Sequence, residues 1–199
     1  SIDTKATVIN AAVANGMDVS LEFVVRNILP VAGNENTLSI LDAYCSKKLV
    51  DDDVFRILNF ACACKDSKTA VGALDCLKRG NQYVLVPSKT VIAMLSERDL
   101  TASDKISILD KLFEFKVEAK SVEAVMTNYL CFNQDPVATR KEVILYLLDK
   151  SPQLPTSTVQ NYVLKCAVDG NEKPAIVKAI FDKGLNTSFF NELLSKYMN

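Results

Sequence analysis

The chain has 199 residues, of which 49% are hydrophobic and 24% are charged, and its formal net charge is −1. This balance is typical of a globular protein that can bury a core, and it excludes a disordered chain. A net charge so close to zero argues against the broad nucleic-acid binding that depends on many phosphate contacts. No apolar run approaches the roughly 18 residues that a membrane-spanning helix needs.

Apolar residues recur at helical spacing along almost the whole chain, and no segment shows the alternation of a strand. In chain order, the first helix is predicted to run from Thr4 to Asn15 and the last from Ser188 to Met198. Between them, helices are predicted to start near Ser20, Thr37, Val54, Lys68, Ser88, Ser103, Ser121, Pro136, Thr156 and Glu172. Taken alternately, these starts form two series, each with a step of about 34 residues.

Some of these starts carry recognisable capping chemistry. Asp135 followed by Pro136 is typical of an N-cap and the first position of a helix. The run Asp51–Asp53 could bind a cation, but carboxylates before a helix also complement the positive end of its dipole. We favour the second interpretation for this run.

The period predicts an all-α fold, a right-handed α-solenoid of helix–turn–helix repeats about 34 residues long. We expect residues 1–199 to form a single array of this kind. The opening helix, Thr4 to Asn15, has no predicted partner before it, so we expect the chain to be an internal or C-terminal piece of a longer repeat protein. Leu148 lies in the apolar stripe of the helix that starts at Pro136, and we expect it in the core.

The residues needed for common catalytic chemistry are missing. The chain contains no histidine, which removes the most common general base and both the Ser/His and Cys/His nucleophile pairs. It also has neither of the glycine-rich phosphate-binding motifs. We therefore expect no enzymatic activity, no cofactor and no small-molecule substrate.

The six cysteines all fall within apolar-periodic segments. They are Cys45, Cys62, Cys64, Cys76, Cys131 and Cys166. The paired CxxC spacing of a zinc site is absent, as is histidine, so we expect none of them to bind a metal. Buried and reduced thiols indicate an intracellular, reducing compartment.

Two or three repeats resemble the pentatricopeptide family in residue type. The stretch from Asn161 to Gly170 resembles the end of that family's first helix and its turn, and Ala179–Leu185 resembles the end of its second helix. The stretch from Leu74 to Gly80 also resembles the end of the family's second helix. The resemblance implies binding of single-stranded organellar RNA, one base per repeat. The departures of this sequence from the family's pattern are similar to those of the animal leucine-rich pentatricopeptide proteins. That resemblance implies a role in mitochondrial mRNA stability, a protein partner and a location in the mitochondrial matrix.

If the chain binds RNA, the contacts should come from the first helix of each pair. Arg56 and Lys89 would then contact phosphates, while Asn59 and Thr127 would face bases. However, the aligned positions carry no recurring polar residue that could serve as a base code. The alternative is a protein-binding α-solenoid scaffold within a larger assembly, with no nucleic-acid contact. The sequence leaves both hypotheses open.

Overall fold

The structure is a computed structural model that describes residues 2–115, 119–132, 134–150, 158–159, 162, 172–183, 191 and 195. All of its described regular elements are α-helices, and no β-strand occurs among these residues, so the predicted all-α class is confirmed. The chain forms two compact units, Ser1–Val117 and Glu118–Asn199. The predicted helix starts at Thr156 and Ser188, and also Cys166, lie outside the described residues. That residues 1–199 form one array stays a prediction.

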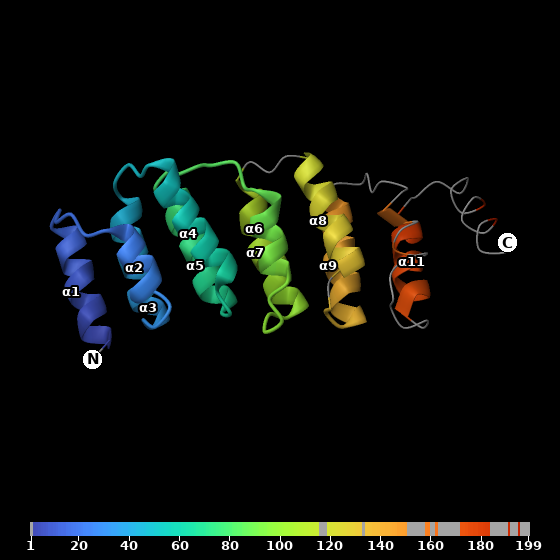
Figure 1. Ribbon diagram of the computed structural model, residues 1–199, viewed down its shortest axis with the longest axis horizontal. Helices are drawn as coiled ribbons and strands as arrows, with labels where there is room; N and C mark the ends of the chain where they lie inside the picture. Colours follow the sequence, from blue (N-terminus) through green and yellow to red (C-terminus); the bar gives the residue numbers. More distant parts are fainter. Residues whose placement is uncertain are drawn as a thin grey trace. The chain divides into compact units, whose positions relative to one another are not determined.

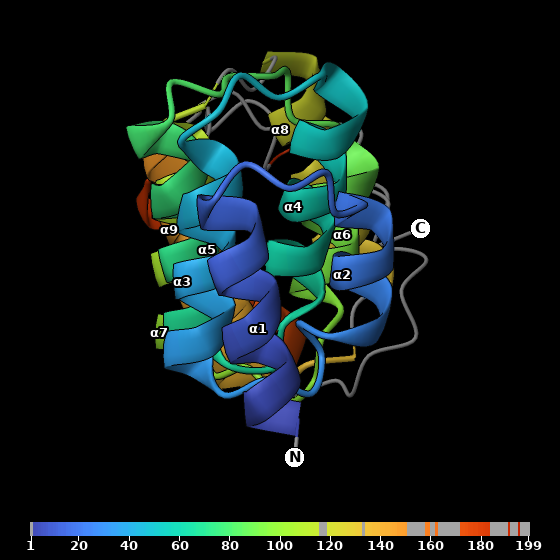
Figure 2. The same ribbon diagram turned by 90° about the vertical axis from the view of Figure 1, so that its left-hand side faces the viewer.

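The first unit consists of two layers of helices. Its helices are α1 (Ile2–Ala14), α2 (Leu21–Asn27), α3 (Asn34–Cys45), α4 (Asp51–Ala63), α5 (Ser67–Arg79), α6 (Ser88–Leu95) and α7 (Ala102–Phe113). Each odd-numbered helix packs against the next odd-numbered one, and α2, α4 and α6 pack in the same order (Figure 1). Figure 2 shows the odd-numbered helices of this unit on one side and the even-numbered ones on the other.

Local capping chemistry fixes several helix starts. The Ser20 side chain accepts a hydrogen bond from the backbone N–H of Phe23, which begins α2 where the sequence predicts it. Thr101 and Asp104 form a reciprocal capping box at the start of α7. The start of α4 differs from the prediction, because the helix begins at Asp51 and not at Val54. The three carboxylates therefore occupy the first helical turn, where the helix dipole favours negative charge.

The odd-numbered helices share one buried face. The buried positions follow the spacing i, i+3, i+4 and i+7, which is one side of an α-helix. They are Thr37, Ile40, Leu41 and Tyr44 in α3; Ala70, Ala73, Leu74 and Leu77 in α5; and Lys105, Ile108, Leu109 and Leu112 in α7. The same face therefore meets a neighbouring helix at each step along the unit.

Lys105 is an exception to the apolar character of this face, because its side chain is fully buried. Its ammonium donates a hydrogen bond of 2.7 Å to the backbone carbonyl of Leu95, the last residue of α6. A cation at the C-terminus of a helix also interacts favourably with the helix dipole. Lys105 thus links the end of one helix to the face of the next.

The second unit contains α8 (Ala119–Phe132), α9 (Val137–Lys150) and α11 (Glu172–Asp182) among its described residues. The α9 helix packs against both α8 and α11. Its buried residues are Arg140, Val143, Ile144, Leu147 and Leu148, so the same spacing recurs here. The Tyr129 hydroxyl of α8 donates a hydrogen bond of 2.6 Å to Asp135 in the turn before α9. Burial and this carboxylate raise the pKa of Tyr129, which keeps the hydroxyl protonated as a donor.

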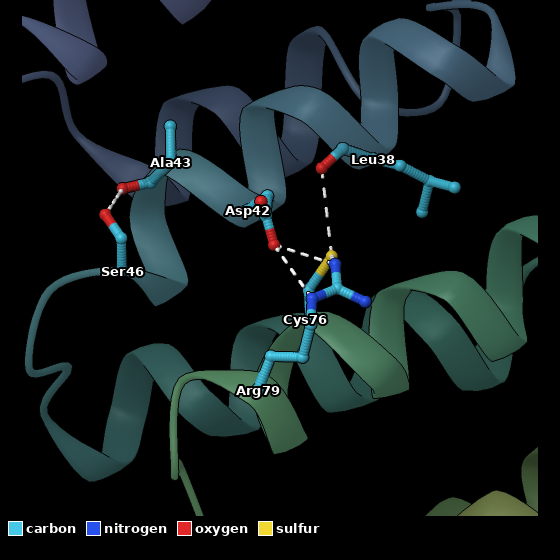
Figure 3. Close-up of polar contacts among 6 residues, drawn as sticks. All are labelled: Leu38, Asp42, Ala43, Ser46, Cys76 and Arg79. Atoms are coloured by element: carbon cyan, nitrogen blue, oxygen red, sulfur yellow. Dashed lines mark hydrogen bonds and ion pairs between the residues drawn. The ribbon is translucent and has the colours of Figure 1, made fainter.

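Polar contacts also join α3 to α5 (Figure 3). The Arg79 guanidinium donates to the Asp42 carboxylate at 2.7 Å, and the Cys76 thiol points at the Leu38 carbonyl at 3.7 Å. An exposed ion pair of this kind adds only about 0–1 kcal/mol.

The five described cysteines are free thiols. Burial raises the pKa of Cys45, Cys62 and Cys64 to about 12 and that of Cys76 to about 11. These four groups are therefore protonated at neutral pH and poor nucleophiles.

Gly80 provides the first test of this packing. A Cβ atom at this position would lie 2.2 Å from the backbone carbonyl oxygen of Cys45, and a backbone atom has little room to move. We expect Gly80→Ala to lower the free energy of unfolding by about 1–3 kcal/mol, the usual cost of overpacking. Gly33→Ala is the matched control, because no heavy atom lies within 4 Å of its added Cβ. Equal denaturation midpoints for the two variants would contradict the close approach of α5 to α3.

Leu148 tests the core of the second unit. Its side chain is 5% exposed, which confirms the predicted burial. We expect Leu148→Ala to lower the free energy of unfolding by about 2–5 kcal/mol, as for other core leucines. Glu142→Ala on the exposed side of the same helix is the control and should change stability little. Urea denaturation followed by circular dichroism measures both, and a wild-type midpoint for Leu148→Ala would refute this packing.

Candidate functional site

Arg56 lies on α4, and two carboxylates surround its guanidinium group. It forms ion pairs with Glu22 at 3.3 Å and with Asp53 at 3.6 Å. Glu22 also pairs with Arg26 at 2.9 Å. An RNA phosphate at Arg56 would therefore have to compete with two carboxylates that are already in place.

The two residues predicted to face bases both form hydrogen bonds to other side chains. Asn59 on α4 accepts a hydrogen bond of 3.1 Å from the Thr90 hydroxyl on α6. In the second unit, the Thr127 and Thr158 hydroxyls lie 2.9 Å apart in a hydrogen bond. In both pairs the partner lies 31 residues further along the chain. These polar groups thus hold two segments together in each unit.

Lys89 differs from the other three predicted contact residues. Its side chain is exposed on α6, and it forms no ion pair with any residue that the structure describes. The structure places Arg56 and Asn59 on one helix and Lys89 on the helix that packs next to it. Thr127 lies in the other unit. The predicted set therefore includes one exposed cation without a carboxylate partner in the described part of the chain.

A different surface emerges at the loops that lead from an odd-numbered helix to the next even-numbered one. These loops are residues 15–20, 46–50 and 80–87, and we call them the loop edge; they lie along the upper side of the first unit in Figure 1. Met17, Val50 and Tyr83 are 64%, 65% and 51% exposed, respectively. The three are evenly spaced in the sequence, since Val50 lies as far after Met17 as Tyr83 lies after Val50. Each of the three loops therefore presents a large apolar side chain, although Val50 is the N-cap of α4 while Met17 and Tyr83 lie further from the next helix.

Side chains hold neighbouring loops together. The Lys47 ammonium donates a hydrogen bond of 3.0 Å to the Val13 carbonyl at the end of α1. Gln82 donates to the Lys47 carbonyl at 2.8 Å and accepts from the Leu49 backbone N–H at 3.3 Å. Gln82 thus joins the third loop to the second, and Lys47 joins the second loop to the end of α1.

Tyr83 has an additional support. Its ring lies 5.7 Å from the ring of Phe115, centroid to centroid, at an angle of 54°. Phe115 is buried, so one side of the Tyr83 ring rests on the core while the rest faces solvent. A tilted aromatic pair of this kind adds about 0.5–1.5 kcal/mol beyond its buried area. The exposed aromatic ring is therefore held in place.

A hollow of about 520 Å³ separates the first two loops. Its lining is mostly polar and contains carboxylates of Asp18, Glu22 and Asp53 together with the phenol of Tyr44. The Tyr44 hydroxyl donates a hydrogen bond of 2.8 Å to the Val19 carbonyl. Burial, with smaller contributions from Asp18 and Asp53, raises the pKa of Tyr44 to about 12. The phenol is thus a permanent donor that ties the first loop to α3.

Sequence reasoning missed the loop edge. The helix-period signal that identifies helices does not extend into loops, and single exposed apolar residues are ordinary on protein surfaces. The signal that could have found it is the presence of a large apolar residue in each of the three predicted breaks between helices.

Comparison with models of known families, with characterised proteins and with solved structures gives no match for this chain. None of the described helices is long and apolar enough to cross a lipid bilayer. Within the part of the chain that the structure describes, no three potential metal ligands gather in one place.

The bond between Asn59 and Thr90 can be tested by a double-mutant cycle. We expect Asn59→Ala and Thr90→Val to be coupled by about 0.5–1.5 kcal/mol, because each removes the same hydrogen bond. Asn59→Ala combined with Ser107→Ala should be additive, since the Ser107 hydroxyl bonds within its own helix to the Ser103 carbonyl. Additivity for Asn59 and Thr90 would show that the amide does not depend on this bond and is free for another ligand.

Proposed function

We propose that this chain is a non-catalytic, protein-binding scaffold built as a right-handed α-solenoid of helix pairs, each about 34 residues long. The buried positions of α3, α5 and α7 support the repeat, because equivalent positions recur at nearly even steps from Thr37 to Ala70 to Lys105. The α9 face, which begins at Arg140, continues the series with a step of similar length. In a stacked array, each repeat packs one face of its helices against the next repeat.

The single observation that carries the binding function is the row of exposed apolar side chains on the loop edge. Isolated exposed apolar residues need no explanation, but larger exposed apolar surfaces mark interaction sites. Met17, Val50 and Tyr83 differ from scattered residues because they lie in the three successive loops at one end of the helices of the first unit. A partner protein that covers these side chains would make an apolar contact at each of the three neighbouring loops.

A second candidate is the pentatricopeptide-like function, binding of single-stranded RNA in the mitochondrial matrix. Exposed Lys89 favours it, since its charge is not balanced by a described carboxylate. The ion pairs of Arg56 and the hydrogen bonds of Asn59 and Thr127 weigh against it. We rank it second for that reason. Buried free thiols favour a reducing, intracellular compartment for either function.

Site-specific photocrosslinking separates the two functions. A benzophenone amino acid is substituted for Tyr83, for Lys89 and, as a control at the opposite end of the helices, for exposed Glu35. We expect position 83 to give discrete protein adducts in cells that survive nuclease treatment, and position 35 to give none. Nuclease-sensitive adducts at position 89 without protein adducts at position 83 would establish the RNA function and refute the scaffold.

A further inference from the structure

We infer that the groove between α1 and α2 is a docking site for one more α-helix of the even-numbered type, joined directly to the start of α1 in the same polypeptide. This inference uses the helix-pair arrangement of the proposed function, but it does not depend on the loop edge or on a partner there. It follows from the way in which even-numbered helices fill the equivalent grooves of the first unit.

The groove between α1 and α2 is apolar and exposed. It forms a hollow of about 560 Å³ whose lining includes Val8 and Ile9 of α1 and Phe23 and Ile28 of α2. Val8 is 63% exposed and Phe23 is 53% exposed. The end face of a repeat array that meets only water is normally polar. Two large exposed apolar side chains in one hollow therefore indicate a face that another element covers.

One helix pair further along the chain, α2 fills the equivalent groove between α3 and α4. Glu22 of α2 forms an ion pair with Arg56 of α4 at 3.3 Å, and the two helices pack together. In the turn after α2, the carbonyl oxygens of Leu29 and Ala32 each accept a hydrogen bond of 3.5 Å from the Thr37 hydroxyl of α3. An even-numbered helix with its C-terminal turn thus contacts both walls of this groove.

The groove between α5 and α6 is filled in the same way by α4. This helix packs against both α5 and α6. Its Asn59 side chain accepts the hydrogen bond from Thr90 of α6. The same kind of element therefore occupies two successive grooves of the first unit, and by equivalence the groove between α1 and α2 fits an even-numbered helix.

Phe23 occupies the position at which an even-numbered helix meets the even-numbered helix before it. The first buried residues of α2 and of α4 have the same spacing, and they are Leu21 and Val24 in α2 and Val54 and Ile57 in α4. Phe23 therefore corresponds to Arg56, whose ion pair reaches back to α2. A helix seated before α2 would contact Phe23 in the same way.

Val8 occupies the corresponding position in the layer of odd-numbered helices. Buried residues with the same spacing align α1 with α3, and they are Ala6 and Val13 in α1 and Thr37 and Tyr44 in α3. Val8 therefore corresponds to Ser39, whose hydroxyl accepts a hydrogen bond of 2.6 Å from Asn10 of α1. Both exposed apolar residues of the groove thus take places that contact the preceding helix pair elsewhere in the unit.

The connections between helices indicate that the docking helix belongs to the same polypeptide. The loops from an even-numbered helix to the next odd-numbered one are short, and they are residues 28–33, 64–66 and 96–101. They lie along the lower side of the first unit in Figure 1, where α1 also starts. A helix seated in the groove as α2 is seated on α3 and α4 therefore ends within a short loop of α1. A covalent connection gives such a helix a high effective concentration at the groove.

A grafted helix tests the inference. A copy of residues 51–66, which form α4 and its loop to α5, replaces the first two residues and is joined to Asp3, so that Asp66 caps α1 as it caps α5. Phe55 of the graft then lies at the position that faces Phe23. We expect hydrogen exchange of the α1 backbone amides to slow at least about tenfold, because a covered helix opens less often than a terminal one.

Variants locate the contact of the graft. In Phe23→Asp, the graft should no longer slow exchange in α1, because a carboxylate would face the apolar Phe55 side chain. Val31→Asp is the matched control, since Val31 is also 53% exposed but lies in the loop after α2, outside the groove. The graft should protect α1 in this control as in the wild type. Circular dichroism confirms that each variant is folded.

The outcomes separate this inference from the proposed function. No slowing of exchange by the graft, or equal slowing in Phe23→Asp and Val31→Asp, overturns the inference. A dimer of the ungrafted chain in sedimentation velocity that Phe23→Asp dissociates also overturns it, because a second copy would then cover the groove. If the graft fails while position 83 still crosslinks to protein in cells, the scaffold function stands and only the docking site is wrong.

Discussion

The odd-numbered helices α3, α5 and α7 bury the positions i, i+3, i+4 and i+7, and each packs against its odd-numbered neighbour. In the first unit, α3 and α5 each lie between two odd-numbered neighbours, and this contact sets the order of the layer (Figures 1 and 2). The remaining contacts adjust this arrangement. Gly80 allows α5 to approach Cys45, Arg79 pairs with Asp42, and Lys105 joins the end of α6 to α7. Because of this stacking, the loops that carry Met17, Val50 and Tyr83 lie at the same end of the helices.

The sequence allowed most of this helical arrangement to be predicted. Helix period and capping residues placed the described helix starts to within about three residues, which is the usual precision of such boundaries. Val54 was assigned too late as a start, because the preceding carboxylates suit the first turn of a helix as well as its cap. Asn59 and Thr127 could be assigned to a helix but not to a partner. Each is bonded to a hydroxyl 31 residues further on, and helical periodicity carries no information on such a contact.

The polar and apolar side chains that stay exposed after folding indicate the kind of partner. Arg56 is held by Glu22 and Asp53, so its charge is largely neutralised within the protein. Met17, Val50 and Tyr83, in contrast, expose more than half of their surface on three loops, of which Gln82 joins the third to the second and Lys47 joins the second to α1. Apolar side chains on loops that are already held by hydrogen bonds cost little to order on binding, which makes them a better interaction surface than mobile ones. This difference leads us to prefer a protein partner to RNA.

The most direct test of the account is the distance between the first and third loops in solution. A spin-labelled amino acid that is not a cysteine, substituted for Met17 and for Tyr83, reports this distance by pulsed electron paramagnetic resonance without modifying the native thiols. The account predicts a single narrow distribution, because hydrogen bonds and ring packing hold the loops in place. Urea should broaden it only at the unfolding transition. A broad distribution, or several distances under native conditions, would contradict a preformed loop edge.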